Sequence, residues 1–139
     1  MDNQVQVQVQ VQKNDLQKSE SNSFTNANIW KEGIKLVKEV YALTKRLPKV
    51  EQYGLSSQLR RASTSILANF AEGYSRSSSA DKTHKYIISR GECSEVKALL
   101  LICAELELVS MSDIKIAIDL TERIGQMLSG LIRSFSYNS

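Results

Sequence analysis

The sequence NIWKEGIKLVKEVYALTKRLP, residues 28–48, carries the clearest helical signal in the chain. Side chains suited to a core recur every three or four residues, which is the spacing of one face of an α-helix. They form two neighbouring stripes, with Trp30, Ile34, Val37, Tyr41 and Thr44 in one and Leu36, Val40, Leu43 and Leu47 in the other. Pro48 ends the pattern, because proline disfavours helical geometry at the residue before it. We therefore predict a long helix that starts near Asn26 or Asn28 and ends at Leu47.

The same spacing recurs three more times between Gly54 and Phe135. It predicts a second helix over about residues 54–74, a third over about 80–108 and a fourth that opens at Ser112 and Asp113. Four long helices joined by short turns pack as antiparallel neighbours. The fold class expected from the sequence is therefore all-α. Residues 24–139 are expected to form an antiparallel, up-down four-helix bundle with packing like that of a coiled coil.

Residues 1–23 have a different character. Glutamine alternates with Val5, Val7, Val9 and Val11, and polar residues follow. Strict alternation is typical of a strand, but four small apolar residues do not stabilise a strand that stands alone. We predict a disordered, low-complexity N-terminal tail over residues 1–23. The alternative is an edge strand that pairs with copies of itself.

The third predicted helix carries more apolar surface than one bundle core requires. Between Ala98 and Ala104 it is apolar around two full turns, and a helix of this kind is covered on more than one side. A second copy of the chain is the simplest cover, so a homo-oligomer is expected. No apolar run approaches the ~20 residues that span a bilayer, and the N-terminus lacks the apolar segment of a signal peptide. We expect a cytoplasmic protein with no membrane contact.

The inventory of reactive side chains argues against an enzyme. His84 is the only histidine, and the two cysteines, Cys93 and Cys103, are expected to be reduced thiols in the core. Zinc and di-iron sites need several His, Cys or paired Glu and His ligands, which this set does not supply. No glycine-rich phosphate loop occurs. We therefore predict no catalytic residue, no metal ligand and no cofactor.

The charges are concentrated in the first half of the predicted bundle. Residues 30–76 carry nine basic and four acidic side chains, a balance of +5, whereas the third and fourth helices together come to −1. A basic surface attracts phosphate backbones without reading sequence. The candidate nucleic-acid-binding residues are Lys38, Lys45, Arg46, Arg60, Arg61 and Arg76. The alternative is a solvated basic face on a protein–protein adaptor or structural oligomer.

A polar stripe follows the second predicted helix and comprises Arg61, Ser65 and Asn69, with Glu72 and Arg76 alongside. Its arginines could line a groove, but we favour a structural role for Asn69, Glu72 and Glu95. Asn69, Glu72 and Glu95 are expected to form a structural polar network, in which the carboxylates pair with Arg61 or Arg76 across helices. The serine-rich run at residues 75–79 precedes a helix N-terminus and is either an anion site or, as we favour, a capping turn.

The string YGLSSQLRRA, residues 53–62, is followed by Ser65-Ile66, NFAEG at residues 69–73, and Arg76. Together with Val40-Tyr41, Leu47-Pro48, Glu51 and Ser94-Glu95, these residues resemble the family of four-helix-bundle proteins encoded in 23S ribosomal RNA intervening sequences. The resemblance covers nearly all of residues 24–135. The departures are the valine-glutamine tail and Leu67, where relatives often have proline.

The resemblance implies a protomer that assembles into a homo-oligomeric ring, in particular a homopentamer. It also implies kinship with the accessory variability protein of diversity-generating retroelements, which partners a reverse transcriptase and binds nucleic acid. The leading hypothesis from the sequence is therefore a non-enzymatic, ring-forming accessory protein that binds RNA, DNA or an RNA–DNA hybrid.

Overall fold

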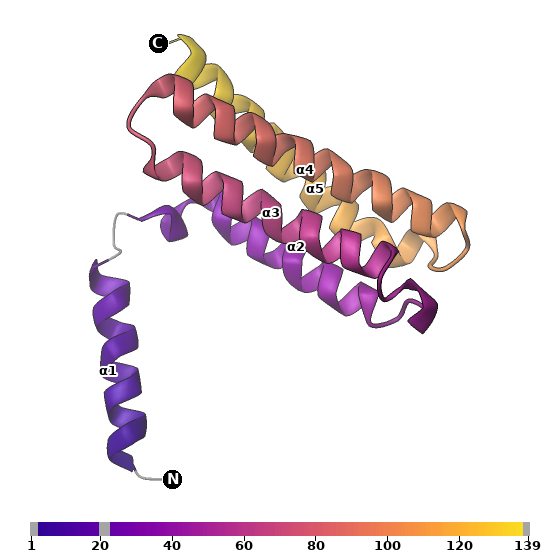
Figure 1. Ribbon diagram of the computed structural model, residues 1–139, viewed down its shortest axis with the longest axis horizontal. Helices are drawn as coiled ribbons and strands as arrows, with labels where there is room; N and C mark the ends of the chain where they lie inside the picture. The colour runs from indigo at the N-terminus through magenta and orange to yellow at the C-terminus, as the bar shows by residue number, and fades with distance from the viewer. Residues whose placement is uncertain (1–2, 20–22, 138–139) are drawn as a thin grey trace.

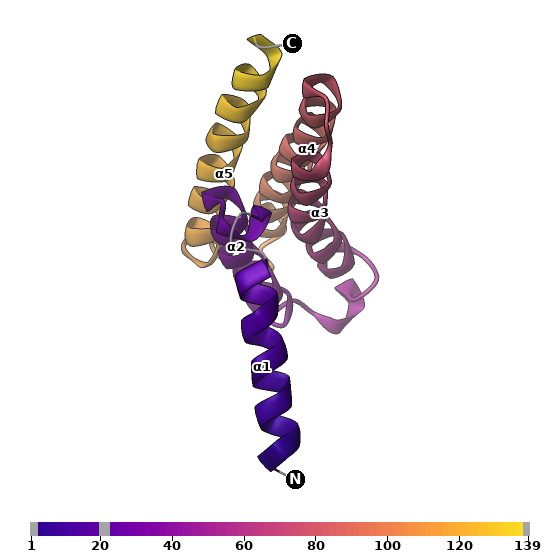
Figure 2. The ribbon, with the colours of Figure 1, turned by 90° about the vertical axis from the view of Figure 1, so that its left-hand side faces the viewer.

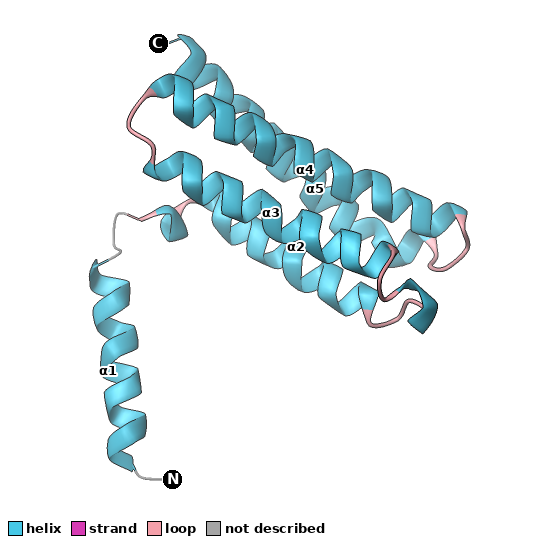
Figure 3. Cartoon of the chain, viewed as in Figure 1, coloured by secondary structure: helices cyan, strands magenta, loops and turns pink. Residues whose placement is uncertain are grey.

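The computed structural model describes residues 3–19 and 23–137; residues 1–2, 20–22 and 138–139, which belong to the predicted tail and bundle domain, lie outside the described residues. The protein is all-helical, and the described residues contain no strand (Figure 3). Their five α-helices and two 3₁₀ turns are α1 (Asn3–Ser19), η1 (Phe24–Asn26), α2 (Asn28–Thr44), η2 (Lys49–Glu51), α3 (Leu55–Ser75), α4 (Ser79–Glu105) and α5 (Met111–Tyr137) (Figure 1). The sequence predicted four helices, and the additional one is α1.

Helix α1 occupies most of the segment for which we predicted disorder or, alternatively, an edge strand. It projects away from the other helices (Figures 1 and 2), and its four valines are exposed. Residues at alternate positions point to different sides of a helix, so these valines form no common apolar face. Glutamine is a good helix former, and residues 1–23 contain neither glycine nor proline. Local propensity, rather than packing on a core, therefore accounts for α1.

Helices α2 to α5, which we call the helical body, enclose one hydrophobic core. Helix α3 packs against α2 and α4, and α5 packs against α4 and α2 (Figure 1). Of the two stripes predicted on α2, the one that contains Leu36 and Val40 is buried, whereas Tyr41 of the other stripe is 37% exposed. The largest fully buried side chains are Tyr86, Phe70, Leu36, Leu59, Ile66, Leu100, Ile114, Ile124, Leu128, Val40, Val96 and Cys103.

The turn between α2 and α3 is held by successive backbone hydrogen bonds. After Pro48, the amides of Glu51, Gln52 and Gly54 donate to the carbonyls of Pro48, Lys49 and Glu51 at 2.9, 3.1 and 3.0 Å. The Glu51 carboxylate then accepts from the Leu55 amide at 3.2 Å and caps α3. A side chain at Gly54 would crowd this cap, since a Cβ there would lie 2.8 Å from Glu51 Oε2. The geometry of the turn is therefore fixed by its own polar groups.

Two glycines allow neighbouring helices to approach closely. At Gly33 of α2, an added Cβ would overlap the side chain of Leu67 on α3. At Gly73 of α3, an added Cβ would lie 2.7 Å from the ring of Tyr86 on α4. Beside the Leu67 contact, the buried Ser89 hydroxyl of α4 donates to the Ile66 carbonyl of α3 at 2.7 Å. These contacts set the relative positions of α2, α3 and α4.

Apolar side chains remain exposed where α4 meets α5. Helix α4 ends at Glu105 rather than Leu108, because Glu107 adopts a left-handed φ of 59° that a continuing helix does not allow. Within the apolar run at residues 98–104, Leu99, Leu100 and Cys103 are buried. The exposed members of this region, which we call the apolar patch, are Leu101, Ile102, Leu106, Met111 and Ile116. Across residues 3–19 and 23–137, no helix combines the length and apolar character needed to cross a membrane.

Candidate nucleic-acid interface

A row of lysines follows the outer face of α2. Lys31, Lys35, Lys38 and Lys45 stand at positions i, i+4, i+7 and i+14, which share one face of a helix, and all four are exposed. We call this row the lysine stripe. Lys35 lies 3.6 Å from Glu32. Among the described residues, no carboxylate lies within 4.0 Å of the other three ammonium groups. Three of the four cations are thus open to an external anion.

The acidic side chain nearest the start of the stripe is directed toward α5. Glu32 is half-buried, and its Oε2 lies 3.3 Å from Arg123 Nη1 on α5. This pair neutralises a carboxylate that would otherwise repel a phosphate near Lys31 and Lys35. Helix α2 therefore presents its lysines to solvent and its Glu32 to a neighbouring helix.

Arg60 connects the end of α2 to the start of α3. Its Nε donates to Thr44 Oγ1 at 2.9 Å, and its Cζ lies 4.7 Å from the centroid of the Tyr41 ring. A guanidinium over an aromatic ring gains a cation–π attraction and keeps its charge. Beside it is a surface cavity of about 470 Å³, lined in part by Lys49, Tyr53 and Arg60. The two cations give this cavity a positive lining.

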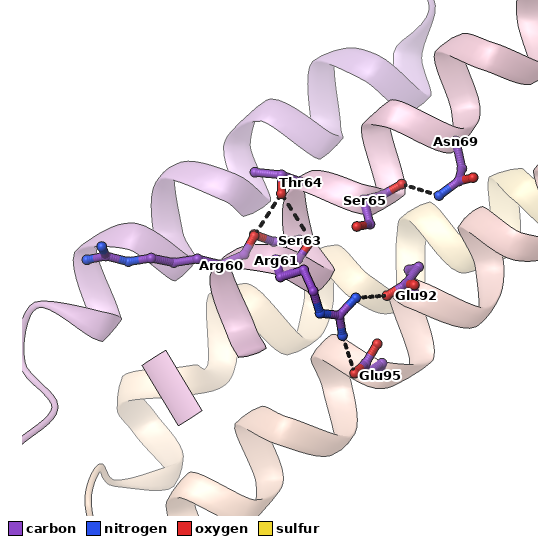
Figure 4. A network of polar contacts seen from close by, with 8 residues as sticks. All are labelled: Arg60, Arg61, Ser63, Thr64, Ser65, Asn69, Glu92 and Glu95. Carbon is purple, nitrogen blue, oxygen red and sulfur yellow. Dashed lines mark hydrogen bonds and ion pairs between the residues drawn. The ribbon is translucent and has the colours of Figure 1, made fainter. Parts of the chain in front are cut away.

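Arg61 points away from Arg60 and toward α4 (Figure 4). Its guanidinium lies 2.6 Å from Glu95 Oε1 and 3.4 Å from Glu92 Oε2. The hydrogen bond with Glu95 raises the pKa of Arg61. A hydrogen bond from Glu92, followed by the bond from Arg61, lowers the pKa of Glu95, whereas burial raises the pKa of Glu92. Because two carboxylates surround it, Arg61 is a structural cation between α3 and α4 and is separate from the lysine stripe.

The remaining candidates from the sequence are dispersed over the helical body. Arg46 is exposed and lies 3.2 Å from Asp113. Arg76 is exposed at the C-terminal end of α3, sixteen residues or roughly 24 Å of helix beyond Arg60. Four of the six candidates therefore lie on α2 or at its junction with α3, namely Lys38, Lys45, Arg46 and Arg60. Arg61 pairs with α4, and Arg76 lies at the far end of α3.

The residues predicted as a polar network do not form one network. Asn69 is half-buried and donates from Nδ2 to the Ser65 carbonyl of its own helix at 2.9 Å (Figure 4). Glu72 lies 2.8 Å from Lys85 Nζ, and this hydrogen bond lowers the pKa of Glu72. Only Glu95 pairs with one of the predicted arginines, Arg61. In the serine-rich turn, Ser78 Oγ accepts from the Asp81 amide at 3.1 Å and caps α4.

The candidate site contains three cations and one aromatic residue that the sequence did not single out. Lys31, Lys35 and Lys49 were counted in the charge balance but not assigned to the interface, although helical spacing aligns the first two with Lys38 and Lys45. Tyr53 is 91% exposed beside Lys49. No local pattern predicts that exposure, because it depends on how the turn after Pro48 folds.

The two thiols are free and buried. Burial raises the pKa of Cys93 to about 11, and its Sγ donates to the Thr121 carbonyl at 3.0 Å. Burial also raises the pKa of Cys103. Both are protonated at neutral pH and are poor nucleophiles. Within the described part of the chain, no three His, Cys, Asp or Glu side chains are grouped as a metal site would need.

Comparisons with known proteins identify the family. A crystal structure of a protein with unknown function from the S23 ribosomal protein family of Bacteroides thetaiotaomicron superposes with a TM-score of 0.69. The two sequences are 23% identical over 75% of this chain and 97% of that one, so this likeness concerns the fold alone. A comparison with curated proteins gives no significant match. The family model for the 23S rRNA-intervening sequence protein matches residues 25–130, and the chain belongs to this family.

Proposed function

We propose that this protein is a non-enzymatic accessory protein that binds the phosphate backbone of RNA or DNA with the outer face of α2. The lysine stripe carries the proposal, because three of its four ammonium groups lack a carboxylate partner among the described residues. From Lys31 to Lys45 the stripe extends roughly 21 Å along the helix. That length matches about six nucleotides of one strand in a B-form duplex.

Binding by the stripe is electrostatic. Lysine ammonium groups that neutralise phosphates release condensed counterions, and this release provides the free energy. Phosphate contacts fix the position of a nucleic acid but carry no sequence information. We therefore expect similar affinity for unrelated sequences and a strong dependence on salt.

The proposal includes assembly of the chain into a homo-oligomer, with the helical body as an up-down four-helix protomer. The apolar patch supports it, because five large apolar side chains are exposed near the turn that joins α4 to α5. Covering such a patch with a second copy is the commonest solution in soluble proteins. A ring, with five copies as the family resemblance implies, would present the stripe several times and increase avidity without any new contact.

A second candidate function is a protein–protein adaptor, and the apolar patch is the observation that favours it. In that case the patch would receive a different protein, and the lysine stripe would be a solvated face. The resemblance to the accessory variability protein makes a reverse transcriptase one candidate partner. Measurement of nucleic-acid affinity distinguishes the two functions.

The test compares two variants with equal net charge. Lys31, Lys38 and Lys45 are replaced by glutamine in one, and Lys97, Lys115 and Arg133 of α4 and α5 in the other. Each set of three substitutions lowers the formal charge from +3 to zero. Binding to labelled RNA and DNA of unrelated sequence is followed by fluorescence anisotropy.

Each lost phosphate contact removes about 0.9 logarithmic units of affinity for a DNA duplex at 0.1 M salt, so the first variant, which loses three contacts, should bind a duplex about 500-fold more weakly. The second variant should bind nearly as well as the wild type. Equal losses in both variants would mean that net charge, rather than the stripe, governs binding. Undetectable binding by the wild type at low salt would favour the adaptor.

A further inference from the structure

The turn between α2 and α3 exposes an aromatic ring within a basic segment. Tyr53 is 91% exposed, and it lines the 470 Å³ cavity together with Lys49 and Arg60. Residues 44–60 contain four basic side chains and one carboxylate, Glu51, which is engaged in capping α3. Tyr41 is also partly exposed and carries the Arg60 guanidinium over its ring. Two aromatic rings, Tyr41 and Tyr53, thus lie close to the cation Arg60 at this end of the helical body.

This combination suits a nucleotide whose base is unpaired. Single-stranded nucleic acid is bound by cations that follow the backbone and by aromatic rings on which the bases stack. The bases of a duplex are already stacked on one another and do not reach a protruding ring. A cavity of about 470 Å³ falls in the range of roughly 300–1,000 Å³ that small-ligand sites occupy.

We propose that Tyr53 stacks on an unpaired base of a single-stranded segment while Lys49 and Arg60 contact its phosphates. The inference rests on the proposed function and names its substrate class, because it adds a preference for unpaired nucleotides to the electrostatic binding by the lysine stripe. The backbone that carries the ring is fixed in advance by three backbone hydrogen bonds of 2.9 to 3.1 Å and by the Glu51 cap. Such preorganisation reduces the entropy lost on binding.

A contact between copies of the chain is the competing use of this turn. Val50 is 85% exposed on the same turn and would favour such an interface. In a two-fold contact, however, Lys49, Arg46 and Lys45 around Val50 would face the same cations of a second copy, and like charges oppose close approach. The charge of the segment therefore favours a polyanion over another copy.

The experiment uses the full chain and three probes, which are a 20-nucleotide oligo(dT), a 20-nucleotide oligo(U) and a 20-base-pair DNA duplex. Variants are Tyr53→Ala, Tyr53→Phe and, as a control for an exposed apolar side chain on the same turn, Val50→Ala. Because Tyr53 is almost fully exposed, none of the changes should affect folding, which circular dichroism checks. Fluorescence anisotropy gives the affinities at several salt concentrations.

Tyr53→Ala should bind both single strands about tenfold more weakly and the duplex within about twofold of the wild type. Tyr53→Phe and Val50→Ala should retain wild-type affinity, and the salt dependence of Tyr53→Ala should be unchanged because no phosphate contact is lost. If the wild type binds but Tyr53→Ala weakens no probe, or weakens single strands and duplex alike, the inference fails and the proposed function stands. A fall in oligomer mass for Tyr53→Ala would assign the turn to an interface between copies. If the wild type binds no probe, both proposals fail.

Discussion

Replacing Gly33 by alanine tests the packing that places α2, and with it the lysine stripe, against α3. The added Cβ would overlap Leu67 Cδ2 and lie 3.0 Å from Leu67 Cγ. Leu67 is only 5% exposed, so its side chain has little room to move aside. Overpacking of this kind destabilises a core by about 1–3 kcal/mol, while exchange of glycine for alanine in a helix stabilises it by about 1 kcal/mol. The net effect expected for Gly33→Ala is a destabilisation of about 0–2 kcal/mol.

A matched variant isolates the packing contribution. Gly91 also lies within a helix, but an added Cβ there would meet no atom within 4 Å. Gly91→Ala should therefore stabilise the protein by about 1 kcal/mol through helix propensity alone. The difference between the two variants, about 1–3 kcal/mol, measures the clash with Leu67. Urea unfolding followed by circular dichroism at one protein concentration provides the free energies.

A double-mutant cycle completes this test. In a Leu67→Ala background the obstruction is gone, so Gly33→Ala should stabilise by about 1 kcal/mol instead of destabilising. If Gly33→Ala stabilises the wild-type background as much as Gly91→Ala does, α2 and α3 do not pack as described. The hydrogen bond from Arg60 to Thr44 depends on the same packing of α2 against α3, and that result would argue against it as well.

Three further outcomes are expected. Because burial raises the pKa of Cys93 to about 11, a thiol reagent at pH 8 should modify it only after unfolding, and rapid reaction of the native protein would contradict its placement. Hydrogen bonds from the Ser110 amide and hydroxyl, followed by the Arg46 contact, lower the pKa of Asp113 below its ordinary 3.8. Because the pKa of Asp113 is lowered on folding, its carboxylate stabilises the folded state at pH values above the ordinary pKa of 3.8. This stabilisation is lost as the pH falls through the folded-state pKa. Asp113→Asn should therefore flatten the pH dependence of unfolding from about pH 4 downward, and an unchanged acid profile would show that the carboxylate contributes nothing. If the apolar patch is an interface, light scattering should give a mass several times 15.6 kDa, and a monomer at micromolar concentration would exclude it.

The four helices of the body could be predicted from the sequence because each buries a long apolar face with a period near 3.6. The alternation of Val5 to Val11 was misleading, since it matches a strand while glutamine favours a helix and no sheet is present in the described residues to accept a strand. We predicted the end of the third helix at about residue 108, three residues too late, because the apolar pattern misled there as well. Leu106 and Leu108 continue the apolar pattern beyond the point where the left-handed Glu107 ends α4.

The candidate interface could be predicted only where it depends on helical spacing. Lys38 and Lys45 lie on the outer face of α2, as charge and periodicity suggest. Helical spacing does not separate Arg61 from Arg60, and the expected carboxylate pairing did not decide between Arg61 and Arg76. The partners of Arg61, Glu92 and Glu95, are more than thirty positions along the chain. Tyr53 carries no local signal at all, since its exposure is a property of the folded turn.

The salt dependence of binding tests the central claim, that the lysine stripe neutralises phosphates, more directly than affinity does. The slope of log affinity against log salt counts the phosphate contacts, with about 0.9 units for each contact on a B-form duplex. Loss of Lys31, Lys38 and Lys45 should make the slope shallower by about 2.7 units. The control variant at Lys97, Lys115 and Arg133 should keep the wild-type slope. A slope that stays unchanged in the stripe variant, or that becomes equally shallow in both variants, would contradict the account.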